Sequence, residues 1–457
     1  MTIEQAINYV YASYMKAEPY MEYNADDSVK RNPEFSKEII EKLAQDQIPT
    51  VLVTGSKGKG SVSKMIAEIF GVHGKTGLMT SPHILNFNER IQIQGEMVTD
   101  AVLAQAIESV KPAFDQVENR ISQQEYISPM GIQAAAALHV FHKEQVAFQV
   151  MECGKGAAYD DVNNVPHQYA VVNRIFLEHT RELGDSLEKI AENKSAIIHR
   201  GQKAVFVSEQ EPEVLAVLEN RAHACKVPLY LYGRDFRAEN IVYTERGMVF
   251  DVVTSTNHYK EIRIPLLGTH QAQNCALAMA LCEKVLMDTV QDINSTIAVM
   301  NEKAIKDALQ KLEWPGRLEV LSSNPMMLLD ACINRESCKN VLEALKQLKH
   351  AQVVTIIGIP SDKDYEGVAE AMVHVSAKLI LTKSQNAHYK FGTEQLEALK
   401  QKGMEVLWTE SIEEAVEKAR EYLQDTGNYE LPIIILGTTS LISDVKRLAA
   451  TPAPCVA

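Results

Sequence analysis

A glycine-rich loop between an apolar run and an amphipathic stretch constrains the fold of this chain more than any other feature. The run is VLV at residues 51–53, the loop is GSKGKGS at Gly55–Ser61, and apolar residues recur at helical spacing over residues 62–70. The glycines let the backbone approach an anion closely, and the amides that open the following helix add donors at the positive end of its dipole. The segment therefore predicts a strand, a phosphate-binding loop and a helix.

The loop is a variant of the nucleotide-binding P-loop. Lys59 supplies a positive charge, and Ser61 occupies the position at which a P-loop hydroxyl ligates the Mg²⁺ of the nucleotide, although Val53 replaces the usual first glycine. A glycine-rich turn with an incidental lysine is the alternative, and the flanking strand and helix argue against it. The residues expected to bind ATP here are Gly55, Ser56, Lys57, Gly58, Lys59, Gly60 and Ser61.

Size and charge narrow the class of protein. The 457 residues exceed the size at which a single core stops growing, so two domains are expected. A net charge of −14 argues against non-specific binding to nucleic acid, and no apolar run is long enough to span a membrane. Residues 1–20 lack the features of a secretory signal, so we expect a cytoplasmic protein with no nucleic-acid or membrane partner. The seven cysteines form no CxxC pair and are expected to be reduced.

The order of apolar runs predicts an α/β fold in two domains. Runs at residues 146–151, 169–175 and 203–207 indicate a parallel sheet, and alternating segments at 248–254 and 261–267 indicate a small antiparallel sheet. Later strands, expected at 326–329, 353–357, 379–382, 405–408 and 433–436, alternate with helix-like segments. We therefore expect an ATP-binding P-loop domain over residues 1–300 and a smaller, doubly wound Rossmann-like domain over residues 301–457.

Further motifs follow the loop in a characteristic order. They are TSPHILNFNERI at 80–91, MECGKG from 151, LEHT at 177–180, IAENKSAI at 190–197, GTHQAQN at 268–274, WPGR at 314–317, DACINRE at 330–336, SDKD at 361–364 and GTTSLISDVK at 437–446. By these motifs the chain resembles the folylpolyglutamate synthase and dihydrofolate synthase family within the Mur ligase superfamily. The resemblance implies an ATP-dependent ligase that phosphorylates a carboxylate and lets an amine attack the acyl phosphate, which yields an amide, ADP and phosphate.

The resemblance also implies which residues handle ATP and metal. Lys59 and the loop amides would hold phosphates, while Ser61, Glu152, His179 and Lys194 would hold Mg²⁺, with Lys194 carbamylated into an anion. The glutamate ends an apolar strand, where α/β sheets place ligand-binding groups. The alternatives are a solvated glutamate for Glu152, a histidine that caps a turn for His179 and a plain surface lysine for Lys194.

Residues near the expected hinge would close the two domains over the reactants. By resemblance Asn274 and Arg317 contact ATP from the hinge side, and Asp330 contacts the nucleotide from the second domain. Closure matters because water destroys an acyl phosphate. A structural salt bridge is the alternative for Arg317 or Asp330. Lys363 and Asp364 either lie at the interdomain cleft or close a turn.

The chain departs from the family pattern where substrates are selected. Residues 151–164 read MECGKGAAYDDVNN instead of LEVGLGGRLDATN, residues 126–129 replace an aromatic-acidic motif, and Ile333 stands where the family has a histidine. Substrate contacts are expected from Ser81, His83, Tyr126, Ser128, Asp160, Asn163, Ile333 and Arg335. We predict an ATP- and Mg²⁺-dependent ligase of a small carboxylic acid and an amino acid or other amine, with folate disfavoured. The alternatives are a ligase for a non-folate acid in a specialised pathway and a non-catalytic ATP-binding switch protein.

Overall fold

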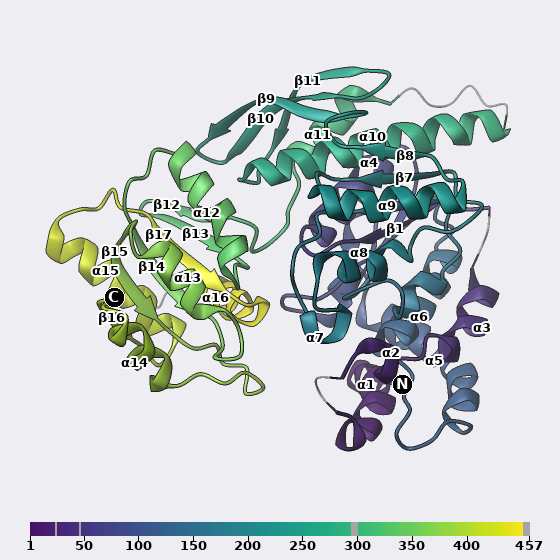
Figure 1. The fold of residues 1–457 in the computed structure, drawn as a ribbon, viewed down its shortest axis with the longest axis horizontal. Helices are drawn as coiled ribbons and strands as arrows, with labels where there is room; N and C mark the ends of the chain where they lie inside the picture. Colours follow the sequence, from purple (N-terminus) through teal and green to yellow (C-terminus); the bar gives the residue numbers. More distant parts are fainter. Residues whose placement is uncertain (23–24, 45–46, 294–299, 451–457) are drawn as a thin grey trace.

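The computed structural model describes residues 1–22, 25–44, 47–293 and 300–450, which form two α/β units side by side (Figure 1). The first unit contains an eight-stranded sheet and a three-stranded antiparallel sheet, and the second contains a six-stranded sheet. Within these ranges no helix combines the length and the apolar character needed to cross a bilayer. The α/β class and the succession of sheets expected from the sequence are confirmed.

The large sheet places the P-loop at its centre. β1 (Thr50–Thr54) lies between β5 (Phe148–Glu152) and β6 (Tyr169–Val172), and the three strands are parallel. The full order is β4-β3-β2-β5-β1-β6-β7-β8. The strands β2 (Thr76–Met79), β7 (Ala204–Val207) and β8 (Leu229–Leu231) each pair in parallel with the neighbour nearer the centre of the sheet. At the other edge β3 (Ile91–Ile93) pairs antiparallel with β2, and β4 (Glu96–Met97) pairs antiparallel with β3. The carboxyl ends of β1, β5 and β6 therefore share one edge.

Helices cover both faces of this sheet, because successive strand residues point to opposite sides. Val51 and Val53 pack in one core beside α4 (Lys59–Gly71) and α10 (Thr269–Ile293), and Leu52 packs in the other beside α5 (Asp100–Glu118) and α6 (Pro129–Lys143). The remaining helices of this unit are α1 (Ile3–Ala17), α2 (Asp27–Lys30), α3 (Glu34–Leu43), α7 (Thr180–Leu183), α8 (Leu187–Ser195) and α9 (Pro212–Cys225), with 3₁₀ segments η1 (Glu18–Tyr20), η2 (Phe87–Arg90) and η3 (Asp161–Asn164).

A small antiparallel sheet follows in the order β11-β10-β9. Its strands are β9 (Arg237–Thr244), β10 (Gly247–Val253) and β11 (His258–Ile264). α11 (Glu302–Gln310) packs against α4 and β11, so its contacts are with the first unit. By these contacts α11 belongs with the first unit.

The second unit has the sheet order β12-β13-β17-β14-β15-β16. The five expected strands are β13 (Met326–Asp330), β14 (Val353–Gly358), β15 (Ser376–Leu381), β16 (Val406–Trp408) and β17 (Ile433–Gly437), and all pair in parallel. Its helices are α12 (Arg335–Gln347), α13 (Tyr365–Met372), α14 (Thr393–Gln401), α15 (Ile412–Thr426) and α16 (Thr439–Ala450). A sixth strand, β12 (Glu319–Ser323), was not expected; it pairs antiparallel with β13 at the sheet edge.

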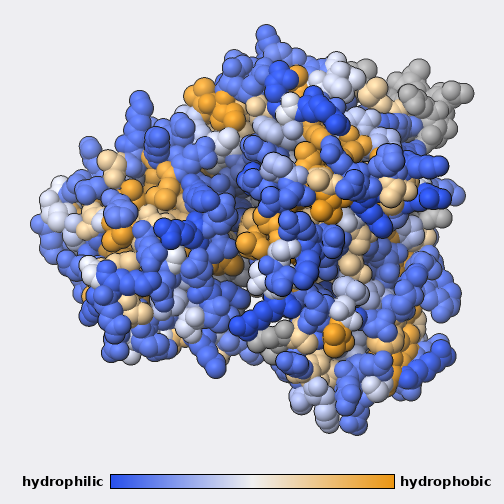
Figure 2. Space-filling model, viewed as in Figure 1, coloured by the Kyte–Doolittle hydropathy of each residue, from blue (hydrophilic) through white to orange (hydrophobic). Residues whose placement is uncertain are grey.

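The face of the molecule in Figure 2 is mostly hydrophilic, with hydrophobic residues in separate small groups, and it is indented where the two units meet. The glycine-rich loop of the first unit and the DACINRE loop of the second unit both face this junction. Residues from both loops line one cavity there. The junction is therefore the place to look for a site.

Candidate active site

The glycine-rich segment forms the expected strand, loop and helix. β1 ends at Thr54, Gly58 has a left-handed φ of 78°, and α4 begins at Lys59. The left-handed φ favours glycine at this position, and a side chain there would also displace the side-chain amide of Asn173. The P-loop geometry predicted from the sequence is confirmed.

A cavity of about 520 Å³, which we call the cleft, opens between this loop and the second unit. Its lining residues carry seven cationic side chains and two carboxylates, although the whole chain has a net charge of −14. Such a concentration of positive charge favours anionic ligands. The cations are Arg31, Lys57, Lys59, Arg90, Lys155, Arg317 and Lys363, and the carboxylates are Glu152 and Glu178.

Glu152 lies at the carboxyl end of β5, buried against the P-loop. Its Oε2 accepts hydrogen bonds from the Thr80 hydroxyl and, at 3.0 Å, from the amide of Ser81. Burial raises the pKa of Glu152, while Lys59 and these hydrogen bonds act in the opposite direction. The residue is therefore a buried, held carboxylate and not the solvated glutamate considered as its alternative.

Ser61 and His179 differ in how their polar atoms are partnered. The Ser61 Oγ is buried and has no hydrogen-bond partner among the described residues. His179 has a left-handed φ of 47° at the start of α7 and lines the cleft, with Nδ1 3.6 Å from Glu182 Oε2. Partial burial lowers the pKa of His179 against the opposing effect of Glu178 and Glu182, which favours the neutral imidazole that can act as a ligand. Over the described ranges, no three His, Cys, Asp or Glu side chains are grouped closely enough to hold a metal alone.

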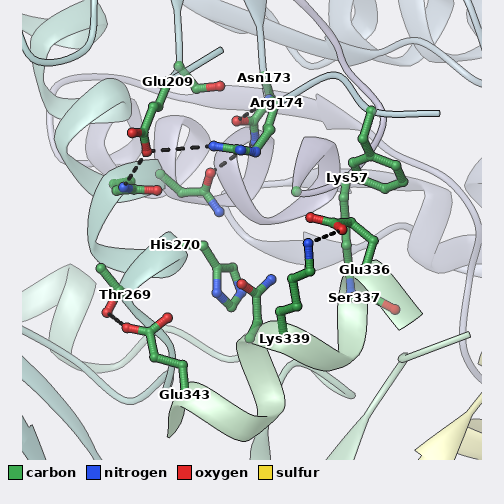
Figure 3. Close-up of a pocket in the computed structure, with 16 residues that line it drawn as sticks. Lys57, Asn173, Arg174, Glu209, Thr269, His270, Glu336, Ser337, Lys339 and Glu343 are labelled. Atoms are coloured by element: carbon green, nitrogen blue, oxygen red, sulfur yellow. Dashed lines mark hydrogen bonds and ion pairs between the residues drawn. The ribbon is translucent and has the colours of Figure 1, made fainter. Parts of the chain in front are cut away.

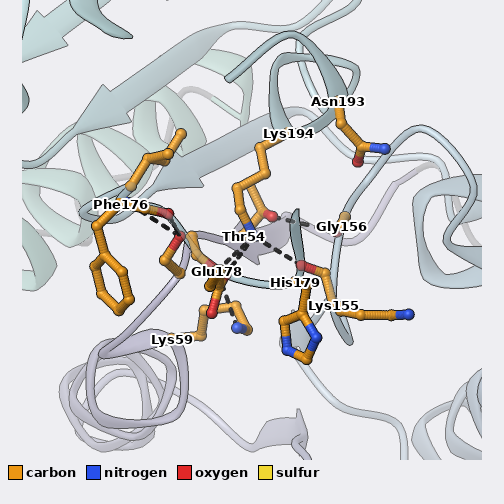
Figure 4. A network of polar contacts seen from close by, with 12 residues as sticks. Thr54, Lys59, Lys155, Gly156, Phe176, Glu178, His179, Asn193 and Lys194 are labelled. Carbon is orange, nitrogen blue, oxygen red and sulfur yellow. Dashed lines mark hydrogen bonds and ion pairs between the residues drawn. The ribbon is translucent and has the colours of Figure 1, made fainter. Parts of the chain in front are cut away.

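Lys194 is fully buried beneath the P-loop, which excludes the surface-lysine alternative (Figure 4). Its Nζ donates to the carbonyl oxygens of Gly55 at 3.0 Å and Lys155 at 2.7 Å and lies 3.0 Å from Glu178 Oε1. Burial lowers the pKa of Lys194 to about 8 despite the neighbouring carboxylate. Three acceptors around one nitrogen suit an ammonium group, which has three donors.

A second cavity, the hinge pocket of about 360 Å³, adjoins the cleft through Lys57 and Gly58 (Figure 3). Asn274 lines it and accepts a hydrogen bond from Asn173 Nδ2 at 2.9 Å. His270 also lines it; its buried Nδ1 has no partner among the described residues, and burial lowers its pKa to about 3. From the second unit, α12 closes the pocket, and Thr269 at the start of α10 donates to Glu343 at 2.5 Å.

The two remaining hinge residues have different surroundings. Arg317 lines the cleft, and its Nη1 donates to the carbonyl of Gly316 at 3.1 Å. Asp330 is buried and accepts a hydrogen bond from the amide of Leu318 at 2.9 Å, which ties β13 to the WPGR loop. The structure therefore gives Asp330 a structural contact. Of the SDKD pair, Lys363 lines the cleft and Asp364 caps α13, so both proposed roles occur.

The expected substrate residues separate into three groups. Ser81 and Ile333 line the cleft. Tyr126, Asp160 and Asn163 line a third cavity of about 500 Å³ behind α2, which we call the α2 pocket. Two others hold neighbouring groups: His83 Nδ1 accepts from Arg90 Nε at 2.9 Å, and Ser128 caps α6.

Arg335 is absent from the lining of the cleft in the described residues. Its side chain is 65% exposed and pairs with Glu370 of α13 at 3.3 Å, while only its backbone amide contacts the SDKD loop. It begins α12 with the side chain directed along the surface, so it supplies no anchor in the cleft.

Three of the cationic residues that line the cleft were not singled out from the sequence. Arg90 belongs to the NERI segment, so its position inside a motif could have marked it as a site residue. Its guanidinium also donates a hydrogen bond to Gln133 Oε1 at 2.9 Å. Lys155 belongs to the MECGKG segment in the same way. Arg31 comes from the N-terminal region, where no motif marks it, and only the fold brings it to the cleft.

Comparisons with known proteins agree with this geometry. The Mur ligase middle domain family matches residues 53–282, and the Mur ligase, glutamate ligase domain family matches residues 316–429. The chain is similar to the folylpolyglutamate synthase of Lacticaseibacillus casei (27% identity, covering 88% of this chain and 90% of the relative). It is also similar to the dihydrofolate synthase/folylpolyglutamate synthase of Bacillus subtilis (25% identity, 96% and 99%). In fold it resembles the Mycobacterium tuberculosis folylpolyglutamate synthase complexed with ADP and AMPPCP (TM-score 0.82, 22% identity, 97% and 99%).

Proposed function

Because this chain belongs to the Mur ligase family, we propose that it is an ATP-dependent ligase of the folylpolyglutamate synthase type that joins a small carboxylic acid to an amino acid. The observation that carries the proposal is the cleft: a P-loop, seven cations and a buried glutamate meet between two units. Joining an acid to an amine requires a leaving group better than oxide, and ATP supplies it by phosphorylating the carboxylate. A cleft lined with cations suits the two anions that must approach each other.

Different parts of the cleft and the hinge pocket bind different parts of the nucleotide. The loop amides and Lys59 bind the transferred phosphoryl group, and the hinge pocket, continuous with the loop through Lys57 and Gly58, accepts the rest of the nucleotide. A carboxylate oxygen of the acid attacks the γ-phosphorus and ADP leaves. The amine then attacks the acyl carbon, phosphate departs with that oxygen, and the amine loses a proton.

Mg²⁺ fits part of the expected ligand set. The orphaned Ser61 hydroxyl and the Glu152 carboxylate would hold an ion that arrives with the nucleotide, since Mg²⁺ commonly takes few protein ligands beside phosphate oxygens and water. When bound, it would neutralise phosphate charge. His179 and Lys194 are proposed as further ligands on the resemblance alone.

Carbamylation of Lys194 stays a prediction. A pKa of about 8 makes the neutral amine that reacts with carbon dioxide accessible. A carbamate would set its oxygens against the carbonyls of Gly55 and Lys155, so the side chain would have to leave its present acceptors.

Water must be kept from the acyl phosphate. Ile333, Asn334 and Tyr389 of the second unit line the cleft opposite the P-loop. Movement of this unit toward the loop would shield the intermediate, as domain closure does in other enzymes that handle reactive species.

We propose that this protein disfavours the ligation of an ordinary folate to glutamate. On the amine side Ile333 offers no hydrogen bond to a carboxylate, and the exposed Arg335 does not compensate for it. The names of the relatives make folate the alternative substrate.

The test is ADP release with Mg²⁺-ATP against a panel of small acids and amino acids, with folates included. The proposal requires ADP formation that depends on both an acid and an amine, and loss of that formation in Lys59→Ala. Lys75→Ala is the matched control, because Lys75 pairs with Glu144 on the surface. ATP binding without acid-dependent turnover would instead favour a non-catalytic switch protein.

A further inference from the structure

Arg31 stands where two cavities meet. It follows α2, and its side chain lines both the cleft and the α2 pocket. The side chain is only 18% exposed. A ligand that extends from the reaction centre into the α2 pocket would pass this guanidinium.

The guanidinium is poorly partnered for a buried group. Among the described residues its side chain makes no hydrogen bond, and its one ion pair joins Nε to Asp27 Oδ1 at 3.7 Å. That same oxygen is 3.1 Å from Lys155 Nζ, so Asp27 is shared with a closer cation. A guanidinium has five N–H donors, and leaving them unpaired in a buried place is unfavourable.

Burial acts to lower the pKa of Arg31, but the nearby carboxylates of Asp160, Asp27 and Asp161 raise it above its usual value. Among the described residues, however, none of these carboxylates accepts a hydrogen bond from the guanidinium. Asp160 directs Oδ2 to the amide of Gly154 at 2.8 Å and Oδ1 to the amide of Val162 at 3.1 Å. At the exposed rim of the α2 pocket, Glu34 pairs with Lys37 and Glu125 accepts from the amide of Ser122. The donors of Arg31 are left for a ligand.

A second observation in the same pocket points to a ligand. Asn163 directs Nδ2 to the carbonyl of Ala196 at 3.2 Å, while its buried Oδ1 has no partner among the described residues. Tyr126 lines the pocket nearby and packs edge-on against Tyr14. The pocket therefore combines an anion-binding fork, a free acceptor and an aromatic ring.

We propose that Arg31 determines specificity by binding a second anionic group of the acid substrate, a carboxylate or a phosphate. The acid would thus carry one carboxylate in the cleft, where it is activated, and another anion at Arg31. The planar fork suits either oxyanion, because both accept two parallel hydrogen bonds. That the bound molecule is a substrate rests on the proposed function, but the anion site itself can be tested without turnover.

The first experiment measures the thermal unfolding of the full chain saturated with Mg²⁺ and AMPPCP, so that the nucleotide site is filled. Succinate and inorganic phosphate are added separately to the wild type, Arg31→Gln and Arg246→Gln. Arg246 is an exposed arginine between β9 and β10 and serves as the matched control. We expect at least one anion to raise the Tm of the wild type and the control by about 2 °C or more, with the shift lost in Arg31→Gln. Equal shifts in all three proteins, or no shift in the wild type, would overturn the proposal.

Arg31→Lys serves as a second variant in case Arg31→Gln folds poorly. It keeps the positive charge at this position but lacks the planar guanidinium that can donate two parallel hydrogen bonds. It should bind AMPPCP normally and show a reduced anion shift; a full shift would contradict recognition by the fork.

The second experiment compares acids with and without a second anionic group: N-acetylglutamine with N-acetylglutamate, and N-acetylserine with N-acetyl-O-phosphoserine. In ADP release, the acid with the second anionic group should exceed its partner by about tenfold in kcat/KM for one pair, and Arg31→Gln should remove the preference. The two pairs distinguish carboxylate from phosphate. A preference for the acids without the second anionic group, or a preference for that group retained in Arg31→Gln, would refute the assignment. Absence of all turnover together with a positive anion shift would instead refute the proposed function.

Discussion

Asp161 allows a pH-dependent prediction with a calculable size. It opens η3, is 1% exposed, and accepts a hydrogen bond from Ser36 Oγ at 2.6 Å. Burial, together with the neighbouring Asp160 carboxylate, raises the pKa of Asp161 from 3.8 to about 7. The folded protein therefore binds a proton at Asp161 over a range in which the unfolded chain has released it.

The sign of the effect follows from this difference. Stability from the protonated Asp161 is fully present below about pH 4 and is lost as the pH rises through about 7, because the folded state then holds a buried charge. The shift of about 3 units, multiplied by 1.36 kcal/mol per unit, corresponds to at most about 4 kcal/mol. Asparagine resembles the protonated acid, so Asp161→Asn should remove this loss.

The assay is urea unfolding of the wild type and Asp161→Asn at several pH values between 4 and 8. We expect near-equal stability at the acid end and a gap in favour of the variant that widens toward pH 8. Asp185→Asn is the control, because Asp185 is exposed and its ion pair with Lys189 lowers its pKa. A gap that stays constant with pH, or a variant that is less stable at pH 8, would refute the reasoning.

Three further predictions concern the cleft. Lys59→Ala should reduce acid-dependent ADP formation by about 10²–10³ in kcat while leaving the circular dichroism spectrum unchanged, since among the described residues the hydrogen bond of Nζ goes to the Gly55 carbonyl in its own loop. Normal turnover would contradict the P-loop role. Lys194→Met should weaken AMPPCP binding in calorimetry and destabilise the fold by about 3 kcal/mol, because Glu178 and two carbonyls lose their shared cation. The predicted carbamate on Lys194 is tested separately by nuclear magnetic resonance of the wild type with carbon-13 bicarbonate. Ligation of tetrahydrofolate to glutamate should fall below that of a dedicated folate enzyme by about tenfold or more in kcat/KM and improve in Ile333→His; efficient folate ligation by the wild type would show that the substitutions are neutral.

Much of the fold could be predicted because its signals are local. The P-loop combines a buried strand, glycines and an amphipathic helix within one short segment, and the later strands are apolar runs separated by helices. Short edge elements were harder. β12 has an intermediate burial pattern and no long apolar run, so its pairing with β13 depends on the hairpin between them. α10 begins at Thr269 within the polar GTHQAQN motif, several of whose residues line the hinge pocket, and the motif forms no apolar run.

The site was predictable where a motif carries its geometry. Lys59, Glu152 and His179 reach the cleft because each follows a strand or begins a helix at the same sheet edge. Arg31 and Arg335 show where prediction of the site from the sequence fails. Arg31 enters the cleft through tertiary packing of α2, and Arg335 leaves it because the first turn of α12 directs its side chain toward Glu370. A position in a motif does not determine where a long side chain points.

The central claim is that this protein transfers a phosphoryl group from ATP to a carboxylate before an amide forms. Its most direct test supplies an accepted acid labelled with oxygen-18 in the carboxylate, together with ATP and the amine, and analyses the released phosphate by mass spectrometry. The account predicts one labelled oxygen in the phosphate for each amide formed, because the acyl phosphate gives up the oxygen that attacked phosphorus. Unlabelled phosphate released alongside the amide would contradict it.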